Sequence, residues 1–156
     1  MIGVPLADGW PPDPLDARPL FLGVTERRVV AFLIDLSIIA LISIVLHMAL
    51  GMLTLMTFGL ASPLHLFLAP PIIGLAYHIL QVGAPVAGTL GMRLMGLRVW
   101  SMSGGRPTML QAVIHAVCYY GSMAVTGGLV CLVALFNRRR QTLHDMLAGL
   151  LVLRQI

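Results

Sequence analysis

The amino-acid sequence predicts an all-α membrane protein, and three observations carry this prediction. Hydrophobic residues make up 58% of the chain and charged residues only 10%, which lies outside the usual range of soluble domains. Residues 29–50 form an apolar run in which Asp35 is the single formal charge. As a helix this run would be about 33 Å long, enough to cross a hydrocarbon core of about 30 Å. Two further apolar runs follow, at residues 64–82 and 109–136.

The expected domain organisation is a tail followed by one membrane domain. Residues 1–24 contain Trp10-Pro11-Pro12-Asp13-Pro14 and Arg18-Pro19, and this density of proline favours a disordered or extended cytoplasmic tail over a helix. The tail lacks the positive n-region and the small-residue cleavage site of a signal peptide, so the run that starts at residue 29 should stay in the mature protein. Residues 25–156 are expected to form the membrane domain.

The second apolar run, residues 64–82, predicts a second firm transmembrane helix. Pro70-Pro71 lies within it and removes backbone hydrogen bonds. The prolines either kink this helix or mark the point where its regular part begins. Carbonyl groups freed by the prolines could instead line an ion path, which is a functional alternative to a simple kink.

The third apolar run, residues 109–136, is long for a straight crossing and contains Gly127-Gly128. Every one of the ten basic residues is an arginine, and the positive-inside rule places the N-terminus in the cytoplasm. A full crossing would carry the C-terminal arginines to the other side. A segment that breaks at the glycine pair and returns would keep all the arginines on one side, so we favour a broken or re-entrant segment buried by protein.

The segment after the second run differs in composition and predicts an interfacial amphipathic helix. Thr89 is a candidate N-cap. The three leucines Leu90, Leu94 and Leu97 recur at helical spacing, while Arg93 and Arg98 lie off that stripe. Residues 97–100 and 151–154 are expected to pair as a small two-stranded sheet on the cytoplasmic side.

Three separated motifs in this chain resemble the RDD family of bacterial membrane proteins. They are the segment from Arg28 to Asp35, the glycine-rich segment 88–99, and the segment 139–149 with Asp145. The resemblance implies a helical membrane domain with a charge constellation of Arg28, Asp35 and Asp145. It implies little chemistry, because the family's molecular role is largely unassigned; transport has been suggested, and some members are linked to cation–proton exchange. Met92 and His115 depart from the lysine and arginine that many members carry.

Asp35 is the residue that most needs an explanation, because an ionisable group inside a membrane helix costs about 2.5–3.5 kcal/mol. The Arg28 side chain leans toward the start of the helix, away from Asp35, so the partner must come from elsewhere. Candidate partners are Arg93, Arg98 and His115. Asp35 is either a hydrogen-bonded staple that holds cytoplasmic elements to the first helix or a carboxyl that exchanges a proton or binds a cation.

The C-terminal polar residues have simpler interpretations. Thr142 and Asp145 are spaced as a capping box before an apolar run, with a direct place of Asp145 in a charge network as the alternative. The run Arg138, Arg139 and Arg140 is expected to anchor to anionic lipid, at about 1 kcal/mol per arginine.

The function classes that the sequence favours are not enzymatic. The histidines show no metal-ligand spacing and no motif places a nucleophile, so we expect no metal, no cofactor and no enzyme. The net charge of +4 comes from arginines that flank apolar runs, which indicates lipid contact and not nucleic-acid binding. We expect an inner-membrane structural or accessory component of a larger complex; the alternative is a cation/proton transport module that acts as a homo-oligomer.

Overall fold

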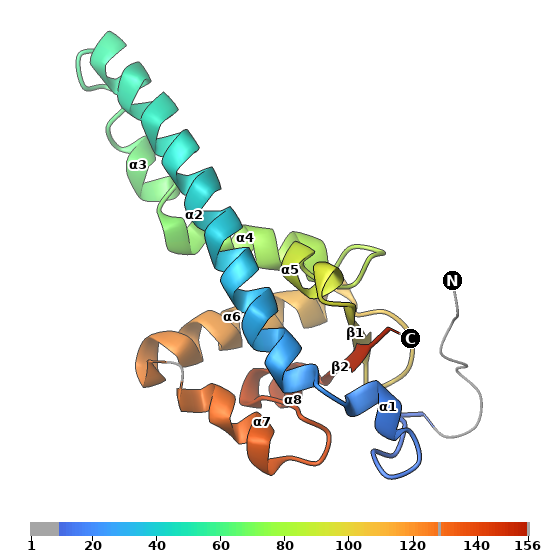
Figure 1. Ribbon diagram of the computed structural model, residues 1–156. Coiled ribbons are helices and arrows are strands. Elements are labelled where there is room, and N and C mark those ends of the chain that lie inside the picture. The colour runs from blue at the N-terminus through green and yellow to red at the C-terminus, as the bar shows by residue number, and fades with distance from the viewer. Residues whose placement is uncertain (1–9, 128, 156) are drawn as a thin grey trace.

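The computed structural model describes residues 10–127 and 129–155 and is mostly helical, with one small sheet (Figure 1). The α-helices are α1 (Arg18–Phe21), α2 (Val24–Met56), α3 (Leu64–Phe67), α4 (Pro70–Val82), α5 (Leu90–Leu94), α6 (Met109–Thr126), α7 (Val133–Phe136) and α8 (Leu143–Ala148). A 3-10 turn, η1 (Leu129–Leu132), precedes α7, and the strands are β1 (Leu97–Ser101) and β2 (Leu150–Arg154).

The first predicted span is the longest element of the molecule. α2 has 33 residues and is therefore about 50 Å long, longer at both ends than residues 29–50. Among the described residues, the stretch Arg18–Met56 is the one helical stretch long and apolar enough to cross a membrane. Only 17% of its most apolar window is buried within the protein, so most of that surface is left for lipid or a partner.

The second firm span is not confirmed. Residues 64–82 form two separate helices, α3 and α4, and α4 has only 13 residues, or about 20 Å, short of a hydrocarbon core of about 30 Å. α4 begins with Pro70 and Pro71 in its first turn. Proline is tolerated there because its missing N–H needs no partner in the first turn, so the pair marks the start of the regular helix.

The third apolar run is broken where the glycine pair predicts it. α6 ends at Thr126, and Gly127 caps it in the left-handed conformation at φ 59° and ψ 25°; Gly128 lies outside the described residues. η1 packs against α6, and α7 then runs back beneath it in Figure 1. The chain therefore returns toward the end of the molecule that carries the sheet.

The small sheet forms the core at the N-terminal end of α2. β1 and β2 pair antiparallel, with Leu97 opposite Arg154 and Ser101 opposite Leu150, which confirms the predicted strands with one residue more in each. Alternate side chains fill two clusters, as the two-residue period of a strand requires. One contains Val24 and Val82 and lies against α2 and α4. The other contains Phe21, so both faces of the sheet are covered.

Part of the predicted tail is folded, because ordered structure begins at Trp10 and not at residue 25. Residues 1–9 lie outside the described residues, but Trp10 packs its ring 5.5 Å from that of Trp100 and donates its indole N–H to the carbonyl oxygen of Ser101 at 2.9 Å. α1 follows and buries Phe21 against β2. The physical reason is that the outer face of the sheet is apolar and needs cover, which proline-rich composition alone does not reveal.

Replacing Trp10 with alanine tests the packing of Trp10 on the outer face of the sheet. Loss of the ring contact and the hydrogen bond should lower the free energy of unfolding by about 2 kcal/mol. Chemical unfolding in detergent micelles, followed by far-UV circular dichroism, measures it. Leu15→Ala is the control, since Leu15 is 74% exposed and should cost far less. Equal stabilities of the two variants would contradict the packing of Trp10 on the sheet.

Candidate functional site

Asp35 is buried in α2 and is held by uncharged donors. Its Oδ1 accepts hydrogen bonds from the Tyr77 hydroxyl at 2.6 Å and from the Gly91 backbone N–H at 2.8 Å. Its Oδ2 accepts one from the Thr89 hydroxyl at 2.6 Å. Thr89 is also the N-cap of α5, as predicted, and its hydroxyl oxygen accepts a hydrogen bond from the backbone N–H of Met92. One carboxylate thus joins α2 to α4 and to the start of α5.

This contact requires a glycine at position 91. A Cβ built there would overlap the carbonyl oxygen of Ala31 and would lie 2.9 Å from Cγ of Asp35. The absence of a side chain lets the backbone of α5 approach α2 closely enough for its N–H to reach the carboxylate.

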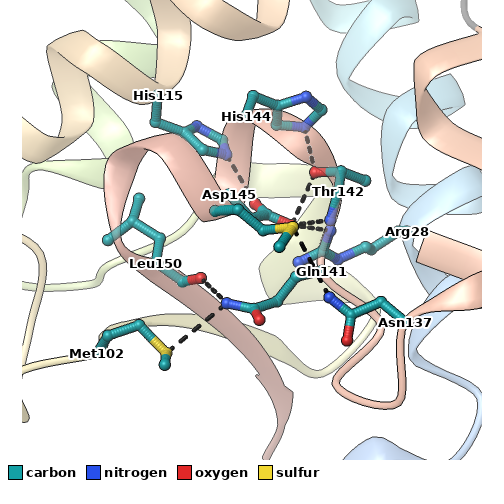
Figure 2. A network of polar contacts seen from close by, with 10 residues as sticks. Arg28, Met102, His115, Asn137, Gln141, Thr142, His144, Asp145 and Leu150 are labelled. Carbon is teal, nitrogen blue, oxygen red and sulfur yellow. Dashed lines mark hydrogen bonds and ion pairs between the residues drawn. The ribbon is translucent and has the colours of Figure 1, made fainter. Parts of the chain in front are cut away.

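Asp145 is the second buried carboxylate, at 1% exposure, and it accepts four hydrogen bonds (Figure 2). Arg28 Nη1 lies 2.5 Å from its Oδ2, and His115 Nε2 lies 3.0 Å from its Oδ1. The Thr142 backbone N–H and hydroxyl donate to Oδ2 at 2.9 and 2.8 Å, which is the predicted capping interaction of α8. Asp145 therefore caps α8 and is also the centre of a charge network, so the two interpretations of this residue are compatible.

The electrostatics of this network keep Asp145 ionised. Burial by itself would raise the pKa of Asp145, but the guanidinium of Arg28 and the hydrogen bond from His115 hold that pKa well below its usual value. The resulting ion pair links the first turns of α2 to α8, with α6 as the third partner.

His144 stays neutral beside this ion pair. Burial lowers the pKa of His144 to about 4, and the nearby carboxylate of Asp145 only partly opposes that shift. The Thr142 hydroxyl donates its single hydrogen to Asp145, so His144 Nε2, at 2.7 Å from the same oxygen, is assigned as the donor to it.

Histidine and tyrosine rings from three helices gather next to Asp145. His78 of α4 lies 5.4 Å from His115 and stacks 5.2 Å from Tyr119, both of α6, by ring centroids. His144 of α8 lies 5.1 Å from His115 and 5.0 Å from Tyr119. The three histidines are at most 7% exposed.

A cavity of about 490 Å³ brings both carboxylates and the three histidines to one place. Its polar lining includes Arg28, Asp35 and Asp145. The rest of its wall is largely apolar, with contributions from α2, α4 and α6. A volume of this size with few polar groups is typical of small-molecule sites.

The predicted ion-pair partners of Asp35 are wrong. His115 bonds Asp145 instead, Arg98 donates to the carbonyl oxygen of Pro85 at 3.2 Å and lies over the Trp100 ring, and Arg93 is exposed. Hydroxyl and backbone donors replace the expected charges. The physical reason is that three short hydrogen bonds satisfy a buried carboxylate without the cost of burying a second charge.

The predicted lipid-anchoring arginines follow α7. Arg138 and Arg140 are exposed and Arg139 is half-buried. Their position leaves the guanidinium groups accessible, and the expected contact with anionic lipid stays a prediction.

Sequence reasoning missed Tyr77, His78 and Tyr119 as members of the site. The spacing of these residues within their helices carries no signal, because their partners come from other elements. The sequence does point to Thr89, as the candidate N-cap, and to Gly91, as part of the glycine-rich segment 88–99. Their contact with Asp35, however, spans 54 and 56 residues of sequence.

Three of these residues could together hold a metal ion. His115, His144 and Asp145 each offer a ligand atom, and the three atoms lie within 4.8 Å of one another. Arg28 already neutralises Asp145, and a divalent ion on that carboxylate would meet the guanidinium at short range. This chemistry favours the ion pair over a metal at this position.

The fold and the site define a small helical membrane protein in which two buried aspartates fasten one long apolar helix to a cluster of short elements. The family model of the RDD family matches residues 22–149, and the chain belongs to this family. The resemblance seen in the three motifs is thereby confirmed. No curated protein and no solved structure matches the chain.

Gly91→Ala tests the close approach of α5 to α2. The added Cβ should push α5 away, weaken the bond to Asp35 and lower the free energy of unfolding by about 3 kcal/mol. The matched control is Gly88→Ala, where the nearest atoms lie 3.7 Å from the new Cβ and little change is expected. Thermal unfolding in micelles compares the two; equal losses would mean that the approach is not tight.

His144 predicts a pH dependence of stability. Between pH 6.5 and about 4 the unfolded chain protonates this histidine while the folded chain does not, so the free energy of unfolding falls as the pH falls. The part of this fall in the free energy of unfolding that is due to His144 is about 3 kcal/mol. Unfolding curves from pH 7 to 4 should show this share in the wild type and lose it in His144→Gln. Parallel curves for both proteins would contradict the prediction.

Proposed function

We propose that this chain is a structural or accessory component of a larger membrane complex, without catalytic activity. The observation that carries the proposal is the environment of Asp35, whose oxygens accept three hydrogen bonds from α4 and the start of α5. Asp145 is held in the same way by α2, α6 and its own helix cap. Carboxylates bonded by so many protein donors are suited to fastening elements together.

The outer part of α2 supports a role in assembly. Beyond its middle, α2 extends away from the sheet with α3 beside it (Figure 1). This part carries large exposed apolar side chains: Leu41, Ile44, Val45, Met48, Met52, Leu53, Leu55 and Met56. In a bilayer such a surface is available to the helices of a partner, which associate through van der Waals packing.

The proposed orientation is an inner-membrane protein with its N-terminus in the cytoplasm. The sheet, α8 and the arginines after α7 gather at the N-terminal end of α2 (Figure 1). The positive-inside rule and the attraction of anionic lipid both favour that end on the cytoplasmic side.

The size of the native assembly tests the accessory role. After mild solubilisation of native membranes, the chain should migrate well above its own mass of 16.8 kDa and above its dimer. Met48→Trp should shift it to smaller species, because Met48 is 72% exposed on α2. Leu15→Trp, at an exposed position outside α2, is the control and should leave the size unchanged. Migration of the wild type as a monomer would refute the proposal.

One observation favours a second candidate, a cation/proton exchange module that acts as a homo-oligomer. Both carboxylates and the three buried histidines line the same cavity, as a proton pathway would require. Purified protein in liposomes with a pH-sensitive dye distinguishes the candidates. Cation-driven proton flux that Asp35→Asn abolishes would support exchange, and absence of flux would support the accessory role.

Asp35→Asn is a suitable variant because it is isosteric. The amide oxygen can replace Oδ1 and accept from Tyr77 and Gly91, while the amide nitrogen faces the Thr89 hydroxyl, which can rotate to accept. The fold should therefore survive, and a loss of flux would report on the lost charge.

A further inference from the structure

We propose that the cavity beside α2 binds one membrane phospholipid. Its phosphate accepts hydrogen bonds from Nε and Nη2 of Arg28, the free edge of the guanidinium, and an acyl chain lies along the apolar wall. The starting observation is an unused set of donors. Nη1 of Arg28 bonds Asp145, but Nε and Nη2 of the same side chain are buried and have no hydrogen-bond partner among the described residues. The hydroxyl oxygen of Thr25, one turn earlier on α2, is also buried and without a partner there.

Buried donors of a charged group are costly to leave unsatisfied. The Nε–Nη2 edge of a guanidinium presents parallel N–H groups that match two oxygens of a phosphate or a carboxylate. Asp145 occupies the other side of the same guanidinium, so the free edge is positioned to take a second oxyanion. Asp35 does not compete for it, because Tyr77, Thr89 and Gly91 already satisfy that carboxylate.

The cavity wall along α2 begins with polar side chains and is apolar beyond Arg28 except for Asp35, whose oxygens already accept three hydrogen bonds. Thr25 and Arg28 line one end, and Phe32, Leu36 and Ile39 continue the same wall. Ile39 lies about 16 Å along the helix from Arg28. A headgroup at the first end and an acyl chain toward the second follow the polarity of the lining.

The same wall gives a lipid a lateral way in. Val29, Phe32 and Leu36 line the cavity and are still 57%, 38% and 50% exposed. These side chains form part of the apolar surface of α2 that faces the bilayer. A phospholipid can therefore enter from the bilayer with its chain along these three side chains of α2.

A phospholipid fits this site better than free phosphate. The apolar part of the wall would stay uncovered around an inorganic ion, and Asp145 would repel that ion without any gain from burial of a chain. The acyl chain supplies that gain, and the phosphate supplies the acceptors that Arg28 lacks.

Native mass spectrometry of protein purified from bilayers tests the proposal. The wild-type chain should retain one phospholipid, from phosphatidylglycerol or phosphatidylethanolamine bilayers alike. Ile39→Trp fills the apolar end and should abolish retention while leaving the Arg28–Asp145 pair untouched. Val45→Trp introduces the same large side chain at an exposed position of α2 outside the cavity and should retain the lipid.

Arg28→Lys tests the headgroup contact. Lysine keeps a positive charge for Asp145 but has no Nε–Nη2 edge, so retention should fall about tenfold. Diacylglycerol, which has the chains and no phosphate, should be retained as weakly by the wild type. Inorganic phosphate added in excess should not displace the phospholipid.

Three results would overturn the proposal. They are a wild type that retains no phospholipid, equal retention by Ile39→Trp and Val45→Trp, and displacement by inorganic phosphate. Retention of diacylglycerol equal to that of phospholipid would overturn the assignment of Arg28 as the headgroup partner.

Discussion

The hydrogen bonds to Asp35 are the constraint on which the rest of the structure depends. A carboxylate in the middle of an apolar helix persists only where donors surround it. Here the donors are a tyrosine of α4, the N-cap residue Thr89 of α5 and Gly91 in the first turn of α5. Fixing α5 against α2 also fixes β1, which follows within a few residues, and therefore the sheet that β1 forms with β2.

Asp145 supplies a second attachment of a different kind. It is paired with a charge, Arg28, and it lies at the start of the short helix that leads into β2. Arg28 and Asp35 are about 10 Å apart along α2, so the two attachments hold the helix at two levels. Together with the packing of Val24 against the sheet, the two attachments define the direction of α2 relative to the sheet.

Features encoded by neighbouring residues could be predicted from the sequence. The helix of residues 29–50, the Thr89 cap, the Thr142–Asp145 cap and the break at Gly127 all depend on local rules of propensity and capping. The strand pair was also within reach, because turn and strand signals flank it. Hydropathy failed for residues 64–82, since it measures composition and ignores that a proline pair inside the run cannot continue a helix from α3.

The partners of Asp35 could not be predicted for a different reason. A buried aspartate suggests a cationic partner, and the predicted partners are two arginines and a histidine. The donors that satisfy it are a phenol, a threonine hydroxyl and a glycine N–H. Nothing in a sequence distinguishes such groups from the many others of the same kind. Tyr77 and Thr89 are 42 and 54 residues from Asp35, so only the tertiary fold reveals the contact.

The length of α2 has a mechanical consequence. Residues 29–56 extend about 42 Å as a helix, well beyond a hydrocarbon core of about 30 Å. A helix that exceeds the local thickness of its bilayer tilts or thickens the lipid around it. Because two side-chain attachments hold the N-terminal part of α2, a tilt of this helix carries the sheet and the short helices with it.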